Sequence, residues 1–113
     1  MSEWTPPQPW RAQAQAVAPE LLRILKLWQG DGHPPGRREL AVRLGVSDRV
    51  LRAAIVALRR QGHLVIPDPD NGGYRFARSL AEVRRFTTGL RDESERLREV
   101  AEQLEQTAAR QFR

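Results

Sequence analysis

The segment from Arg37 to Gly62 places two short amphipathic patterns on either side of a three-residue turn, and this arrangement constrains the fold more than any other part of the sequence. In its second half, apolar residues recur at helical spacing, which at about 100° per residue puts them on one face: Leu51, Ala54, Ile55 and Leu58. Ser47 stands where a hydroxyl can accept the amide hydrogens of a first helical turn, and Gly62 stands where helices commonly end. The pattern predicts a helix over residues 48–61.

A smaller apolar patch precedes this helix. Leu40, Ala41 and Leu44 share a face of a second, shorter helix that Gly45 would end. Gly45 to Ser47 then forms the turn. Two helices joined this closely predict a helix-turn-helix.

The residues that follow predict a β-hairpin. His63 to Ile66 has the apolar and β-branched content of a short strand, Pro67 to Gly73 is rich in turn residues, and Tyr74 to Ala77 alternates like a returning strand. This order of elements resembles the winged helix-turn-helix domain of the biotin operon repressor type. The resemblance is carried by RELAVRLGVSDRVLRAAIVALRRQGHLV, a glycine-rich turn and then GYRF. The resemblance covers roughly Glu20 to Ala77. It implies a domain that binds duplex DNA with residues 48–61 as a recognition helix in the major groove.

The hairpin differs from the wings that usually accompany such domains. Its tip carries Asp68 and Asp70 and no basic residue, so it gains nothing from contact with phosphate. We therefore expect the tip to be held away from DNA, and contacts from this region to come from Arg75 or Arg78.

Residues 19–29 predict the central helix of the domain, because they are apolar almost all round. The run from Trp10 to Ala18 is compatible with a helix, but Pro19 suits a first helical turn, so we expect the helix to start there. Residues 1–18 are then a flexible, proline-rich arm. Its tryptophans, Trp4 and Trp10, are expected to pack on the domain, with a partner or a groove as the alternatives.

Residues 79–113 predict a long amphipathic helix. Ser79 and Glu82 form a capping box at its start, and Gly89 marks a bend or a break. Apolar residues follow a heptad spacing typical of helix association: Val83, Phe86, Leu90, Leu97, Val100 and Leu104. About thirty helical residues would extend roughly 45 Å, more than the width of a small domain, so we expect a homodimer through this helix. The alternative is a helix that folds back and completes the core of its own chain.

The charge of the chain is concentrated in the predicted helix-turn-helix. The net charge is +5, and the stretch from Arg37 to Arg60 carries seven arginines against Glu39 and Asp48, whereas acidic and basic residues balance in 79–113. A basic helix face is typical of nucleic-acid binding, with a solvated arginine-rich surface as the other interpretation.

No catalytic pattern is visible. His33 and His63 have no nucleophile or ligand set at a recognisable spacing, the glycines match no phosphate-binding loop, and the chain has no cysteine. We therefore expect no enzyme activity, no metal and no cofactor. Without a signal sequence or an apolar run of about 18 residues, a cytoplasmic, nucleoid-associated protein with no membrane partner is expected.

The expected DNA contacts fall into two groups. Arg49 and Arg52, near the start of the recognition helix, are assigned to base readout, and Asp48 is expected to cap the helix or orient an arginine. The remaining candidates are assigned to phosphate or backbone contact: Arg37, Arg38, Arg43, Ser47, Arg59, Arg60 and Arg75.

Together these patterns predict a mainly α (α+β) chain in three parts, residues 1–18 as an arm, 19–78 as a winged helix-turn-helix and 79–113 as an oligomerisation helix. The function expected is sequence-specific binding of double-stranded DNA, as a transcriptional regulator or a phage or mobile-element factor. The alternative is a winged-helix module for protein interaction in a replication or repair assembly. Non-specific nucleic-acid binding through charge is a third possibility.

Overall fold

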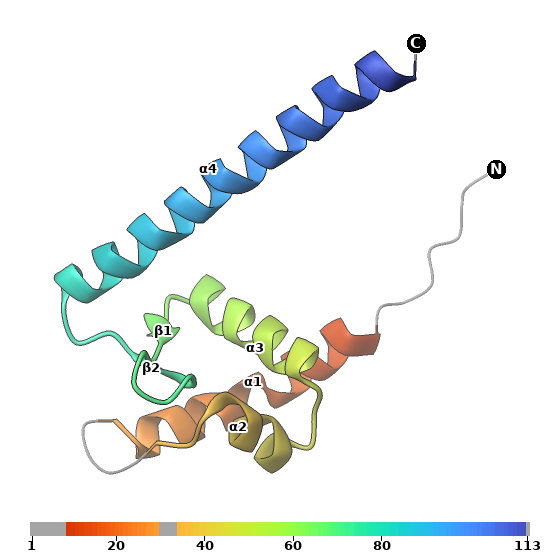
Figure 1. Ribbon diagram of the computed structural model, residues 1–113. Helices are drawn as coiled ribbons and strands as arrows, with labels where there is room; N and C mark the ends of the chain where they lie inside the picture. Colours follow the sequence, from red (N-terminus) through yellow and green to blue (C-terminus); the bar gives the residue numbers. More distant parts are fainter. Residues whose placement is uncertain (1–8, 30–33, 113) are drawn as a thin grey trace. The chain divides into compact units, whose positions relative to one another are not determined.

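The computed structural model describes residues 9–29 and 34–112 of the 113-residue chain. Within them lie four helices and two strands (Figure 1), in the order α1 (Pro9–Leu27), α2 (Arg37–Leu44), α3 (Asp48–Arg60), β1 (Val65–Pro67), β2 (Tyr74–Phe76) and α4 (Leu80–Gln111). The chain is thus mainly helical with a small antiparallel sheet, as predicted. It divides into two compact units, Met1–Ala77 and Arg78–Arg113. None of the helices in the described ranges is long and apolar enough to cross a membrane.

Helix α1 begins ten residues earlier than the sequence predicts. Pro9 occupies its first position and Pro19 lies inside it, so the expected start at Pro19 is wrong, and residues 9–18 of the predicted arm are helical. A proline inside a helix removes one backbone hydrogen bond, but Pro19 is exposed, where water can satisfy the carbonyl left over. Ala14 and Ala18 are buried on another face of the helix, and their packing outweighs the local cost.

Helices α2 and α3 and the turn between them form as predicted. Gly45 ends α2 in the left-handed conformation, with φ of 66°. Ser47 caps α3, its hydroxyl oxygen accepting a hydrogen bond from the Val50 amide at 3.2 Å. Helix α3 ends at Arg60, one residue before the predicted end, and packs mainly against α1.

The buried faces of these helices and of β1 form one core. Its most fully enclosed side chains come from every element of the first unit except β2: Leu21, Leu40, Leu51, Ile55, Leu58 and Val65. The ring of Trp10 packs partly against this core, as predicted, as does that of Trp28. Trp4 lies outside the described residues.

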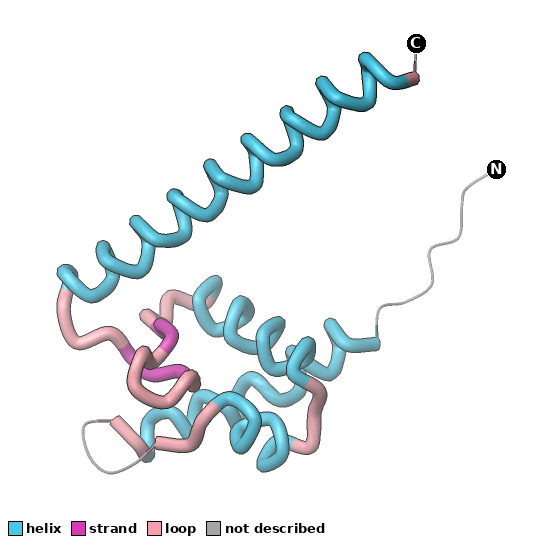
Figure 2. The backbone as a smooth tube through the Cα atoms, viewed as in Figure 1, coloured by secondary structure: helices cyan, strands magenta, loops and turns pink. Residues whose placement is uncertain are grey.

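The predicted hairpin is present, with strands shorter than expected. Strands β1 and β2 pair antiparallel, Val65 facing Phe76 and Pro67 facing Tyr74, and a loop of irregular backbone joins them (Figure 2). His63 and Leu64 precede β1 rather than belonging to it.

The hairpin tip is fastened to the segment that precedes α2. The Asn71 side-chain amide donates a hydrogen bond to the Pro34 carbonyl at 2.7 Å. Gly73 passes so close that an added Cβ would lie 2.7 Å from the Pro35 carbonyl oxygen. This contact requires glycine and fixes the tip to the start of the helix-turn-helix segment.

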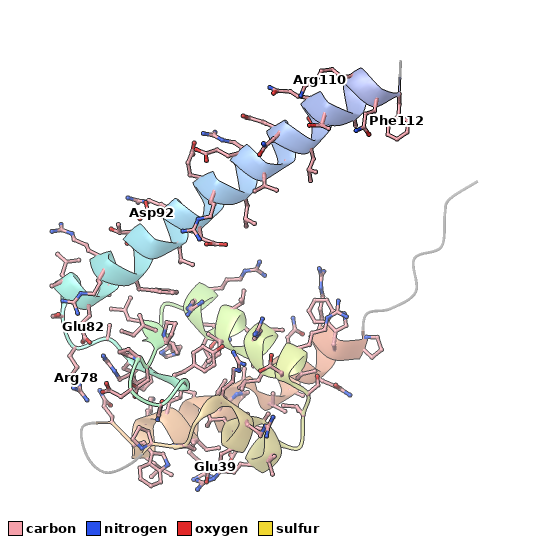
Figure 3. The ribbon with its side chains drawn as sticks, in the orientation of Figure 1. Glu39, Arg78, Glu82, Asp92, Arg110 and Phe112 are labelled. Atoms are coloured by element: carbon pink, nitrogen blue, oxygen red, sulfur yellow. The ribbon has the colours of Figure 1, made fainter. Side chains whose placement is uncertain are left out.

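The second unit consists chiefly of α4. The helix is continuous through Gly89, so the predicted bend or break is absent, and Ser79 caps its start by accepting a hydrogen bond from the Glu82 amide. The Glu82 carboxylate in turn accepts from the Arg78 amide at 2.7 Å, which completes a variant of the predicted capping box. Figure 3 shows side chains projecting all along α4, from Glu82 near its start through Asp92 to Arg110 near its end.

None of the residues of α4 is buried. At four of the predicted heptad positions the apolar side chain is about half exposed or more, Leu97 among them at 60%, whereas Val83 and Phe86 are partly buried.

Candidate nucleic-acid interface

The outward face of α3 carries arginines around one apolar residue. Its buried face turns Val50, Leu51, Ala54, Ile55 and Leu58 to the core. Helical geometry therefore turns the other side to solvent, where four exposed side chains lie: Arg49, Arg52, Val56 and Arg60. Val56, 42% exposed, has an arginine four residues before it and another four residues after it.

Asp48 joins the starts of α2 and α3. One carboxylate oxygen lies 2.9 Å from the Nε of Arg37, and the other lies 2.9 Å from the Nε of Arg52. The sequence predicts that Asp48 caps α3 or orients an arginine, and in the structure it pairs with two. All three side chains are about half exposed, so these ion pairs orient the arginine side chains more than they stabilise the fold.

The other arginines of α2 differ in their surroundings. Arg43 pairs with Glu39 at 3.0 Å across one turn of the helix. Arg38 is exposed, and within the described ranges it makes no hydrogen bond or ion pair through its side chain, and the same holds for Arg60 on α3. These two guanidinium groups are the best placed to meet a phosphate without breaking another contact.

Arg49 stacks on Trp10. Its guanidinium carbon lies 4.5 Å from the centre of the indole ring, and that of Arg11 lies 5.0 Å from the same ring. The early start of α1 therefore places an aromatic residue beside the first turn of α3. Trp10 was not among the predicted site residues, and its position depends on α1 extending back to Pro9.

Arg59 points to the hairpin. Its Nε donates a hydrogen bond to the Val65 carbonyl oxygen at 2.8 Å, and its side chain is partly buried. Burial lowers the pKa of the Arg59 guanidinium, and the nearby Tyr74 opposes this shift. The guanidinium nevertheless keeps its proton at neutral pH. Arg59, which the sequence predicts to contact a phosphate, thus differs from the other arginines, because its side chain supports β1.

Two of the hairpin's charged side chains, those of Asp68 and Arg75, are largely buried and lie next to each other. Asp68 is 6% exposed; one of its carboxylate oxygens accepts the Asp70 amide hydrogen at 2.9 Å, and the other lies 4.0 Å from the Nε of Arg75. Of the two acidic residues that the sequence places at the tip, Asp68 therefore closes the turn from a buried position beside Arg75, and Asp70 is exposed. Arg75, predicted as a DNA contact, has a side chain only 19% exposed and also donates to the Phe76 carbonyl.

The predicted site residues thus fall into two sets, one on α2, on α3 and in the turn between them, and one whose side chains support the hairpin. The first set consists of Arg37, Arg38, Arg43, Ser47, Asp48, Arg49, Arg52 and Arg60, and the second of Arg59 and Arg75. Ser47 belongs to the first set by position, although its hydroxyl is also the cap of α3. In the described part of the chain, no group of three or more acidic or histidine side chains is arranged to hold a metal ion.

Comparison of the chain with protein-family models, with curated proteins and with solved structures found no match.

Proposed function

We propose that this protein binds double-stranded DNA sequence-specifically as a winged helix-turn-helix, with α3 in the major groove. The observation that carries the proposal is the outward face of α3, where three exposed arginines lie on the side opposite the core. An α-helix fits the major groove, and arginine can donate two parallel hydrogen bonds to guanine there. The arginines of α2 extend the positive surface, since Asp48 links the two helices at their first residues.

Position along α3 divides the contacts. Arg49 and Arg52 lie in the first turns of the helix, the part that reaches base edges in helix-turn-helix proteins, and are assigned to base readout. Val56 lies one to two turns further along and can make the apolar contact that recognises a thymine methyl group. Arg38 and Arg60 are assigned to phosphates, which fix the register without reading sequence.

The β1–β2 hairpin acts as the wing, with a smaller part in binding than its counterparts usually have. Asp68 and Arg75 offset each other inside it, which leaves Asp70 as an exposed acidic group at the tip. Such a wing adds little attraction to phosphate. Most of the affinity of one domain must therefore come from α2 and α3.

Self-association through α4 would restore affinity by joining two such domains. The helix has exposed apolar residues at heptad spacing and no buried residue, which is the pattern of a helix that packs on a second copy. Two linked domains bind two half-sites with a large gain in avidity. The expected operator is a palindrome whose half-sites lie about one helical turn, roughly 10 base pairs, apart or at a multiple of that spacing.

The test is a fluorescence-anisotropy titration of the full chain with random-sequence duplex over a salt series. We expect affinity that falls steeply with salt, and a clear loss in the variant carrying both Arg49→Ala and Arg52→Ala. Lys26→Ala removes one exposed positive charge from α1, half of the charge lost in the double variant, and as a control for charge it should have a small effect. Negligible affinity at low salt, or an unchanged affinity in the double variant, would refute the proposal.

Selection of bound sequences from a random duplex pool then separates specific from non-specific binding. A palindromic consensus supports the proposed function, whereas recovery of unrelated sequences supports binding through charge alone. If no DNA is retained, the exposed apolar face of α4 favours the protein-interaction module instead.

A further inference from the structure

The first turn of α1 supplies a flat aromatic surface next to the exposed face of α3. Arg49 stacks on the Trp10 ring with its guanidinium carbon 4.5 Å from the ring centre. The side chain of Trp10 is itself fixed in place, because it is partly buried and packs against the core of the first unit. The ring is thus attached to the core of the first unit, and the exposed Arg49 lies over it, with Arg11 at 5.0 Å from the same ring.

Stacking leaves the N–H donors of the Arg49 guanidinium available for hydrogen bonds. A guanidinium attracted to the face of an aromatic ring keeps its N–H donors in its own plane, where they can reach other acceptors. Within the described residues, the side chain of Arg49 makes no hydrogen bond and no ion pair. Arg52, by contrast, is directed by an ion pair with Asp48 at 2.9 Å.

The two base-reading candidates are therefore oriented by different means, one by a carboxylate and one by an aromatic ring. An arginine already ordered before binding loses less conformational freedom when it meets its base. Substitution of the ring should cost affinity even though the ring carries no charge.

We propose that Trp10 is a positioning residue for sequence readout, holding Arg49 in the orientation that meets a guanine edge. This inference rests on the proposed function, and it adds the first turn of α1 to the interface. Trp10 acts through Arg49, so its contribution should disappear when Arg49 is absent. It should also depend on an aromatic face rather than on bulk alone.

The experiment is a double-mutant cycle on the full chain, measured by anisotropy with the duplex recovered from the selection. Trp10→Leu retains apolar packing but removes the ring, whereas Trp10→Phe retains a ring. Each is combined with Arg49 and with Arg49→Ala, and thermal melting checks that each variant is folded. We expect Trp10→Leu to weaken binding about three- to tenfold when Arg49 is present and to have no further effect beside Arg49→Ala. Trp10→Phe should retain most of the affinity.

Salt dependence provides a further test. Trp10→Leu removes no charge, so the slope of log affinity against log salt should stay at the wild-type value, whereas Arg38→Ala should reduce its magnitude by about 0.9. In the free protein, NMR should show the Arg49 side-chain Nε–H proton shifted upfield by the ring current of Trp10. That shift tests the stacking even if Trp10→Leu does not fold.

Four results would overturn the inference. They are equal losses for Trp10→Leu and Trp10→Phe, the same loss with and without Arg49, a change in salt slope with Trp10→Leu, and the absence of the ring-current shift. In each case, DNA binding by the wild-type protein would leave the proposed function standing. A wild-type protein that binds no duplex, or a selection that yields no consensus sequence, would refute the proposed function and this inference together.

Discussion

Arg59 and Arg60 are adjacent, identical in type and predicted to differ completely in what they do. Arg59 donates a hydrogen bond to the Val65 carbonyl at 2.8 Å from a partly buried position, whereas Arg60 is exposed. Replacing each by alanine therefore separates support of the hairpin from contact with DNA.

The structure sets the size of the effect at Arg59. A hydrogen bond from a charged group contributes about 1.5–3 kcal/mol, and partial exposure of Arg59 favours the lower end. Val65 is almost wholly buried, so water compensates poorly for the lost donor. Arg59→Ala should lower the free energy of unfolding by about 1.5 kcal/mol, or the melting temperature of the first unit by about 6–12 °C.

Arg60→Ala should leave that melting temperature within about 2 °C, because an exposed arginine contributes little to stability. It should instead reduce the magnitude of the salt slope for DNA binding by about 0.9, the value for one phosphate contact. Arg59→Ala should leave the slope unchanged at a temperature where the variant is folded. Thermal melting by circular dichroism and a salt series by anisotropy measure the two quantities. Equal destabilisation by both substitutions, or a loss of salt slope with Arg59→Ala, would refute the division of roles.

Three other substitutions test separate features. Asp48→Asn should lower the free energy of unfolding by about 0.5–1.5 kcal/mol by weakening two exposed ion pairs. It should raise affinity for random duplex by removing a negative charge but reduce the preference for the selected duplex, because Arg52 loses the partner that orients it; an unchanged preference would contradict the assignment of Asp48 as an orienting group. Leu97→Glu should abolish self-association in sedimentation equilibrium, while Ala109→Glu, on the opposite side of α4 from the heptad positions, should leave it intact; equal behaviour of the two would exclude the apolar face as the contact. Gly89→Ala should stabilise α4 by about 1 kcal/mol, seen as a higher helix melting temperature, because an added Cβ meets no atom within 4 Å; destabilisation would show that the helix is bent there in solution.

Much of the fold could be predicted because its signals are local. Ser47 and Ser79 cap helices by accepting hydrogen bonds from amides three residues later, and Gly45 ends one by taking a positive φ. Such signals depend on a few neighbouring residues, so the sequence is sufficient to find them. The start of α1 was missed because it depends on burial of Ala14 and Ala18 against the rest of the unit, which overrides the helix-start signal of Pro19.

The candidate site is harder to predict, because the sign of a side chain's charge does not determine whether it is buried or which residues it contacts. Asp68 and Asp70 look alike in sequence, but one is buried beside Arg75 and the other is exposed. The position of Arg49 near the start of residues 48–61 marks it as a candidate for base readout, but no pattern in the sequence indicates that the first turn of α1 supplies an aromatic ring beside it. These properties follow from contacts between segments far apart in the chain, which periodicity alone does not reveal.

The bond between Asn71 and Pro34 joins residues 37 positions apart and so closes α2, α3 and the hairpin into one loop. Close by, the Ala77 amide donates to the Leu64 carbonyl at 2.8 Å, which fixes the last residue of the first unit to the start of the hairpin. The place where the chain leaves this unit is therefore constant with respect to α3. In a dimer, the first unit would therefore act as a rigid body. The segment from Arg78 onward would then set the distance between the two half-sites. Insertions after Ala77 should then change which operator spacing is bound without changing the sequence of either half-site.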